Sequence, residues 1–328
     1  MHSDHLIVDQ PAGSSGAREN TGAQGAALGS GSTLGDILNH PAFAGFARQM
    51  LPWDGRAYDS SLPLRDIDSL LPYHSHVEPA VVLAGLNRMI ADVAAGRTIF
   101  YDIYSAAQKQ AQPLKQNTGL FFFRGRPGAP FAIIAPGGGF AYVGSVHEGF
   151  PYAQEISSRG YNAFVLKYRA GQGGRIATED LAAAISFVFR NAKALQVGTE
   201  DYSLWGSSAG ARMAAFVGSH GVAAFGGDVL PKPSTVVTAY TAHSDTSSDE
   251  PPTFVVVGEQ DGITPPSSMQ DRIAILRRDG APVEFHRYPN VGHGFGTGAG
   301  TSADGWISDA VRFWEKHMQS NAKQEKIP

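Results

Sequence analysis

The stretch that decides the fold is residues 202–210, Tyr-Ser-Leu-Trp-Gly-Ser-Ser-Ala-Gly, where an apolar run meets small residues. Residues 202–205 have the character of a strand, and 209–217 that of a small-residue helix. A strand, a sharp turn and a helix in this order place Ser208 at the apex, at the carboxyl edge of a parallel sheet. Free N–H groups of the helix lie beneath it. Because chance also produces Gly-x-Ser-x-Gly in a glycine-rich chain, the surrounding sequence must decide its meaning.

Around this turn, apolar strands alternate with amphipathic helices from residue 98 to residue 320. The pattern predicts a doubly wound α/β domain with a mostly parallel sheet. Its first two strands are expected to pair antiparallel, and Ser145 with Glu148 reads as a capping box that starts a helix, as does Thr178 at the start of the next one. The expected strands are 98–104, 120–123, 131–135, 161–168, 202–205, 235–240, 253–257 and 283–288.

The rest of the chain divides into three segments. Residues 1–32 are poor in large apolar side chains, which predicts a flexible tail. Residues 33–97 show helical spacing of apolar residues and predict a helical extension, which could roof the active site or pack against the back of the sheet. Residues 321–328 are expected to form a C-terminal tail.

Composition excludes several classes of function. The 328 residues are 42% hydrophobic, carry a net charge of −4 with both signs interspersed, and include no cysteine. Nucleic-acid binding, disulfides and thiolate chemistry are therefore not expected. His74 and His76 lack a third ligand at a suitable spacing, so neither a metal nor another cofactor is expected. No apolar segment near the N-terminus fits a signal peptide or membrane span, which favours a soluble cytoplasmic protein and leaves open a leader removed earlier.

Two further strand ends carry groups that would complement Ser208. His293 lies in a glycine-flanked loop after the last strand and can serve as the general base. Asp261 follows the strand 253–257 and can orient that imidazole, with Glu259 and Asp245 as competing acids.

The glycine triplet 137–139 ends the strand 131–135. Successive glycines let backbone N–H groups approach a developing oxyanion without a Cβ in the way. The expected donors are Gly138, Gly139 and, after the nucleophile, Ala209. A flexible loop is the alternative interpretation of such a triplet.

The order Ser208, Asp261, His293 behind a glycine loop resembles the α/β-hydrolase superfamily over about residues 98–318. The loop 136–140 and the elbow are similar to those of bacterial carboxylesterases and acetylesterases related to the hormone-sensitive-lipase and acetyl-xylan-esterase groups. Pro136 stands where that loop usually has a bracing histidine, and Ala211 where a second glycine often follows the elbow. The resemblance implies a serine carboxylesterase.

The substrate is less defined. The twelve residues 241–252 leave no room for a helical lid, which favours a small-molecule ester with a short, acetyl-like acyl group. Alternatives are a serine peptidase of the prolyl-oligopeptidase type and a non-catalytic binding module. Aromatic and histidine side chains near the strand ends are candidates to line the pocket, with core packing as the other interpretation: Phe140, Tyr142, Tyr168, Tyr240, His243 and Phe295.

Overall fold

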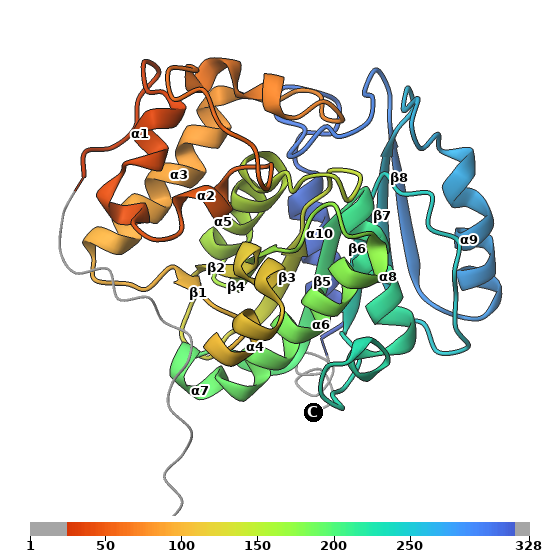
Figure 1. Cartoon of the computed structure of the whole chain (residues 1–328). Coiled ribbons are helices and arrows are strands. Elements are labelled where there is room, and N and C mark those ends of the chain that lie inside the picture. Colours follow the sequence, from red (N-terminus) through yellow and green to blue (C-terminus); the bar gives the residue numbers. More distant parts are fainter. Residues whose placement is uncertain (1–24, 319–328) are drawn as a thin grey trace, which may run out of the picture.

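The computed structural model describes residues 25–318, so residues 1–24 of the expected N-terminal tail and the whole expected C-terminal tail, 321–328, lie outside the described residues. Eight strands form one sheet in the order β1-β2-β4-β3-β5-β6-β7-β8 (Figure 1). β2 runs antiparallel to β1 and β4, and the other neighbours are parallel, as predicted. The strands are β1 (Phe100–Tyr101), β2 (Gly119–Phe123), β3 (Pro130–Ala135), β4 (Asn162–Lys167), β5 (Gly198–Ser207), β6 (Thr235–Ala239), β7 (Thr253–Gly258) and β8 (Val283–Tyr288).

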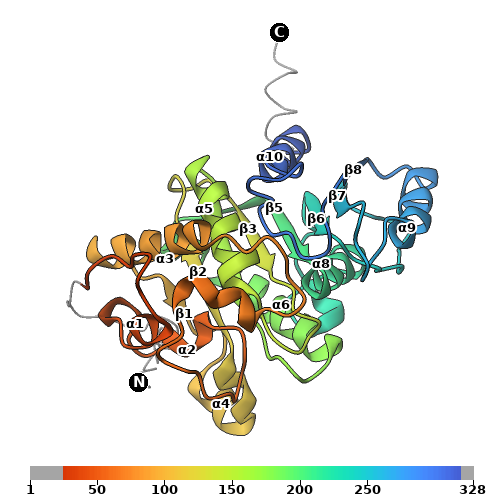
Figure 2. The same cartoon turned by 90° about the horizontal axis from the view of Figure 1, so that it is seen from above.

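Both faces of the sheet are buried because side chains alternate along each strand. In β2, Phe121 and Phe123 pack into one hydrophobic layer, and Leu120 and Phe122 into the other. α5 (Phe150–Ser158) and α10 (Trp306–Lys316) cover the first layer, whereas α6 (Gly174–Arg190) and α8 (Ala209–His220) cover the second, and α9 (Ser267–Arg278) lies beside β8 (Figure 2). Shorter helical pieces are α4 (Ala106–Ala111), α7 (Ala192–Leu195) and the 3₁₀ turns Pro113–Asn117 and Val222–Phe225.

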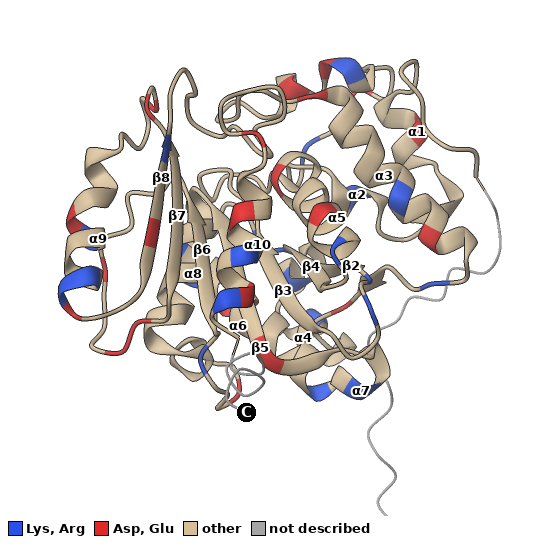
Figure 3. Cartoon of the chain, turned by 180° about the vertical axis from the view of Figure 1, so that it is seen from behind, with Lys and Arg blue, Asp and Glu red and all other residues tan. Residues whose placement is uncertain are grey.

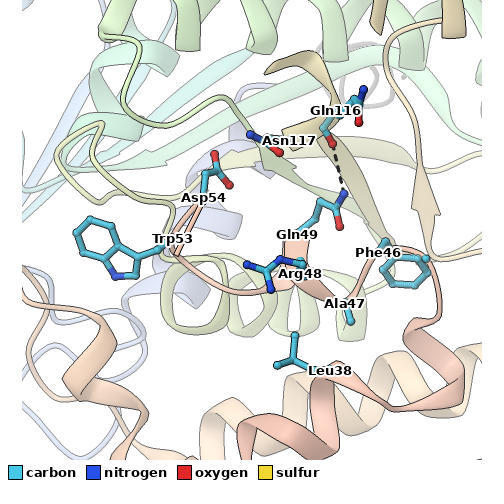
Figure 4. Close-up of a pocket in the computed structure, with 11 residues that line it drawn as sticks. Leu38, Phe46, Ala47, Arg48, Gln49, Trp53, Asp54, Gln116 and Asn117 are labelled. Atoms are coloured by element: carbon cyan, nitrogen blue, oxygen red, sulfur yellow. Dashed lines mark hydrogen bonds between the residues drawn. The ribbon is translucent and has the colours of Figure 1, made fainter. Parts of the chain in front are cut away.

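The N-terminal extension shares the first of these two cores. It consists of α1 (Leu34–Leu38), α2 (Ala47–Met50), α3 (Pro79–Ala94) and the 3₁₀ turns Pro41–Phe43 and Leu64–Leu70. Its apolar side chains join those of α5 in one continuous cluster. Two polar contacts add to this packing: the Nζ of buried Lys167 lies 2.7 Å from Asp54 Oδ1, and Gln49 donates to the carbonyl of Gln116 (Figure 4).

Three local expectations are wrong, because residues that resemble a tail or a helix cap have other partners in the fold. The tail prediction fails for residues 25–32, where Leu28 is buried and its N–H donates to Asn87 Oδ1. α6 begins at Gly174, a turn before the expected cap, and the Thr178 hydroxyl donates to the Gly174 carbonyl. Ser145 and Glu148 form no capping box; they lie in a π-helical turn, Ser145–Gly149, with Glu148 fully buried.

The connection between β6 and β7 contains no helix, in agreement with the expected lack of a lid there. Over the helices α9 and α10, acidic and basic residues are mixed rather than separated (Figure 3). The extension reaches the carboxyl edge of the sheet: its segment after the turn Leu64–Leu70 runs toward the loop that precedes α10 (Figure 1).

Candidate active site

Ser208 occupies the sharp turn between β5 and α8. Its backbone has φ 51° and ψ −116°, a conformation that is costly for a residue with a side chain. The N–H of Ser208 donates to the carbonyl of Ala239 on the neighbouring strand, which holds the turn. A Cβ on Gly210 would lie 1.9 Å from the carbonyl oxygen of Ala135, so only glycine lets the helix start this close to the sheet.

The structure brings Ser208, His293 and Asp261 together in one hydrogen-bonded chain. His293 Nε2 lies 2.9 Å from Ser208 Oγ, and His293 Nδ1 lies 2.8 Å from Asp261 Oδ2. The carboxylate and the imidazole are buried, and the serine is partly exposed. This arrangement can accept a proton from the hydroxyl and stabilise the imidazolium that results.

Asp261 is held by more partners than the sequence indicated. Its Oδ1 accepts from the N–H groups of Ile263 and Thr264 at 2.9 and 2.7 Å, and its Oδ2 accepts from the Thr264 hydroxyl at 3.0 Å. Burial alone would raise the pKa of Asp261, but the hydrogen bonds from His293 and from these N–H groups outweigh it, so the pKa is lowered. The carboxyl group therefore stays charged beside the imidazole at neutral pH.

The two competing acids lie elsewhere. Glu259 is exposed and pairs with Arg287 at 3.5 Å. Asp245 pairs with His220 on α8. Neither has a contact with His293 among the described residues, so the geometry favours Asp261.

The glycine loop passes directly beside the nucleophile. A Cβ on Gly137 would lie 3.0 Å from Ser208 Cβ, and Gly138 has φ +139°, where its missing Cβ avoids the Tyr142 carbonyl. Within residues 25–318, the N–H groups of Gly138, Gly139 and Ala209 donate to no protein acceptor. These three N–H groups are therefore free to donate to an oxygen of a bound molecule.

The N–H of Gly137 is not available, because it already donates to Glu148. The sequence pattern did not indicate this acceptor. This fully buried carboxylate accepts from Gly137 N at 2.6 Å and from the Tyr240 hydroxyl at 2.6 Å. His74 Nε2 lies 3.1 Å from its other side. Burial would raise the pKa of Glu148, but the charge of His74 and its hydrogen bond outweigh burial and lower the pKa. The sequence does contain a signal for this contact, because Glu148 lies close to the glycine triplet along the chain. The interpretation of Glu148 as part of a capping box gave it a different role.

The segment 73–75 of the extension contacts both the loop of His293 and the glycine loop. The Ser75 hydroxyl donates to the carbonyl of His293 at 2.7 Å, and Ser75 N donates to the carbonyl of Gly294 at 3.0 Å. On the other side, His74 Nδ1 is 2.7 Å from the Tyr142 hydroxyl, behind the glycine loop. Tyr73 is 46% exposed, and its ring would lie 3.0 Å from a Cβ on Gly139. The extension therefore forms part of the site.

Most of the expected pocket residues are instead core residues. Tyr142, Tyr168, Tyr240 and Phe295 have no exposed surface, because their rings pack beneath the two loops and their hydroxyls, where present, bond to protein groups. His243 is also buried, against Phe216. Phe140 is partly buried and lines a hollow beside α8.

Within residues 25–318, no three histidine, cysteine or acidic side chains gather in a way that could bind a metal ion. His74 is committed to Glu148 and Tyr142 and so does not pair with His76. None of the described helices is long and apolar enough to cross a membrane.

Two family models match adjoining parts of the chain. The BD-FAE model matches residues 124–235, and the model of the prolyl oligopeptidase family matches residues 231–321. The first covers Ser208 and the glycine loop, and the second covers Asp261 and His293. An acetylxylan esterase of Xylanibacter ruminicola is 27% identical over 97 residues, which are 29% of this chain and 20% of that protein. The chain thus matches only about a fifth of this relative.

Solved structures share the fold. An acetyl ester-xyloside bifunctional hydrolase of Caldicellulosiruptor lactoaceticus has a TM-score of 0.55 and 23% identity over 61% of this chain and 88% of that one. A propionate-bound thermophilic esterase of Thermogutta terrifontis has a TM-score of 0.54 and 17% identity over 61% of this chain and 89% of its own. The chain is therefore an α/β hydrolase by fold, and it resembles the esterases of that superfamily.

Proposed function

We propose that this chain is a serine carboxylesterase that hydrolyses short-chain acyl esters, with acetyl as the preferred acyl group. The observation that carries the proposal is the hydrogen-bonded chain from Ser208 through His293 to Asp261, on a serine held in a strained turn. A serine that only caps a helix needs no buried imidazole 2.9 Å from its hydroxyl. It also needs no unpaired backbone N–H groups in the neighbouring loop.

In the proposed reaction, His293 accepts the proton of Ser208 while the serine oxygen attacks the ester carbonyl. The N–H groups of Gly138, Gly139 and Ala209 stabilise the negative oxygen of the tetrahedral intermediate. The C–O bond to the alcohol breaks, and His293 returns the proton to the departing oxygen. Water, activated by the same imidazole, then releases the acyl group from Ser208.

Two observations support a short acyl group. The connection between β6 and β7 has no helix that could form an apolar lid. The related proteins are named as an acetylxylan esterase, an acetyl ester-xyloside hydrolase and an esterase with bound propionate, all with small acyl groups. By analogy, acetyl esters are the first substrates to test.

The test is hydrolysis of 4-nitrophenyl acetate by the full chain and by Ser208→Ala. We expect kcat to fall more than about 1000-fold in that variant. Ser207→Ala is the matched control, because the Ser207 hydroxyl is hydrogen-bonded to the Tyr152 hydroxyl rather than to His293. A reactive phosphonate should label Ser208. Full activity in Ser208→Ala would refute Ser208 as the nucleophile, and no labelling of Ser208 would favour a non-catalytic binding module instead.

A second candidate is a peptidase, because the prolyl oligopeptidase family model covers both Asp261 and His293. Its chemistry would use the same three side chains on an amide bond. A panel of proline-containing peptide substrates separates the two candidates. Peptide cleavage without ester turnover would replace our proposal, whereas ester turnover alone would support it.

A further inference from the structure

A hollow of about 770 Å³ opens beside the helix that begins at the nucleophile. Its lining comes from α8, from the start of α6 and from Phe140, which directly follows the glycine triplet. The hollow is thus bounded by the two elements that carry Ser208 and the oxyanion loop. The lining residues are Phe140, Gly174, Arg175, Thr178, Arg212, Phe216, His220, Ala224, Phe225 and Asp245.

Arg212 is the uncompensated charge in this hollow. It is exposed, and within residues 25–318 its side chain has neither an ion pair nor a hydrogen bond. Two of the other ionisable groups there have partners: Arg175 pairs with Glu179, and the Asp245 carboxylate is hydrogen-bonded to His220. A guanidinium without a carboxylate partner, facing a hollow, is suited to bind an anionic ligand.

The position of Arg212 matches the reach of a substrate bound at Ser208. The two residues lie four apart at the start of α8, and the Arg212 N–H donates to the Ser208 carbonyl, so they are one helical turn, about 5.4 Å, apart along the axis. Phe140 and Phe216 line the same hollow and give it aromatic surface. An aromatic or similarly flat group that carries a carboxylate would pack against the phenylalanine rings and pair with the Arg212 guanidinium.

We propose that this hollow receives the alcohol part of the ester and that Arg212 selects alcohols that carry a carboxylate. The proposal rests on the proposed esterase function and names the substrate class for that same site. The carboxylate forms a bidentate pair with the Arg212 guanidinium while the ester carbonyl lies at Ser208. Arg212 is then a specificity-determining residue and takes no part in proton transfer.

A matched pair of acetyl esters tests this: 4-acetoxybenzoate, with a carboxylate one ring away from the ester, and neutral 4-acetoxybenzamide. For the full chain we expect kcat/KM to be about 5- to 30-fold higher for the benzoate at low salt, within the range of an exposed charge-assisted pair. In Arg212→Met this ratio should fall to about 1. Arg212→Lys should retain part of it, because the charge remains and the planar fork is lost. The control Arg277→Met, on the exposed side of α9, should keep the full ratio.

Salt gives a second readout, because 0.5 M salt screens an exposed pair and should reduce the ratio in the full chain but not in Arg212→Met. An equal ratio in the full chain and in Arg212→Met would overturn the role of Arg212. If both esters are nevertheless hydrolysed, and hydrolysis is lost in Ser208→Ala, the esterase proposal survives that result. If the full chain hydrolyses neither these esters nor 4-nitrophenyl acetate, both proposals fail.

Discussion

Replacement of Glu148 by glutamine tests whether the buried network positions the glycine loop. Glutamine has nearly the shape of glutamate, so it leaves no cavity, but it lacks the charge and replaces one acceptor oxygen with a donor. Three donors face the present carboxylate: Gly137 N, Tyr240 OH and His74 Nε2. An amide can satisfy only part of this set, since its NH₂ group must face at least one of them.

The magnitude follows from these three contacts. Hydrogen bonds to a charged group contribute about 1.5–3 kcal/mol and neutral ones about 0.5–1.5 kcal/mol, so each retained bond weakens by about 1 kcal/mol. Summed over the site, we expect the free energy of unfolding to fall by roughly 2–4 kcal/mol, which corresponds to a Tm decrease of roughly 4–10 °C. The weaker contacts also hold the Gly137 N–H less firmly, so the adjoining N–H groups of Gly138 and Gly139, the proposed oxyanion donors, can shift from their positions. Loss of one whole donor costs about 2.7–4 kcal/mol, so partial displacement should lower kcat by about 10- to 100-fold.

The assay compares kcat, KM and Tm of Glu148→Gln with those of the unmodified chain on 4-nitrophenyl acetate. We expect kcat to fall while KM changes by less than about twofold, because the loop acts mainly on the transition state. Glu315→Gln is the matched control: Glu315 accepts from the Tyr161 hydroxyl at 2.8 Å, far along the chain from the glycine loop. It should lower Tm modestly and leave kcat unchanged.

Two results would refute this reasoning. If Tm falls in Glu148→Gln but kcat stays within twofold, Glu148 stabilises the fold without positioning the oxyanion donors. If neither changes, the carboxylate is not the acceptor for Gly137 that its 2.6 Å separation indicates. A fall in both kcat and substrate affinity would point to a general collapse of the pocket instead.

Two further predictions concern the triad and its surroundings. Thr264→Val removes the hydroxyl that donates to Asp261 Oδ2 at 3.0 Å but keeps the Thr264 N–H bond, so kcat/KM for 4-nitrophenyl acetate should fall about 2- to 12-fold; unchanged kinetics would contradict a role for this hydroxyl. Burial, together with the charge of His74, lowers the pKa of His147 to about 4, and its ring donates to the Gly294 carbonyl. In the unfolded chain His147 is protonated below about pH 6.5, whereas in the folded chain it is protonated only below about pH 4. The free energy of unfolding should therefore decrease by up to about 3 kcal/mol as the pH falls through this window. Urea unfolding between pH 7.5 and 4.5 measures this, and His147→Gln should flatten the curve; parallel curves would show that His147 does not cause the loss.

The sheet could be predicted from the sequence because its signals are local. The continuous apolar runs of β2 and β3 directly reflect burial on two faces. The elbow was equally readable, since the close approach of Gly210 to the Ala135 carbonyl permits only glycine. The boundaries of α6 and of the turn before α5 were misjudged, because Thr178 and Glu148 resemble caps and have other partners in the fold.

The candidate site was predictable only where its members end a strand. Ser208, Asp261 and His293 share the carboxyl edge of one sheet, so the order of strands brings them near one another. No such rule places His74, which reaches Glu148 from 74 residues away and from outside the sheet. The pocket assignment failed for the same reason: Tyr142, Tyr240 and Phe295 are covered by the extension and its neighbours, and a sequence pattern does not show what lies above a loop.

The departure at Pro136 takes on a physical meaning from this network. A loop of the related His-Gly-Gly-Gly type implies a histidine that braces the glycines, and proline at this position has no side chain that can donate. Here the Tyr168 hydroxyl binds the Pro136 carbonyl at 2.6 Å, Glu148 binds the Gly137 N–H, and His74 supports Glu148 from the extension. In this chain the glycine loop is therefore held by the buried carboxylate of Glu148 and by the extension that carries His74, rather than by a side chain of the loop itself. It follows that residues 73–75, which also donate to the carbonyl groups of His293 and Gly294, fix the position of the glycine loop together with the sheet that carries it.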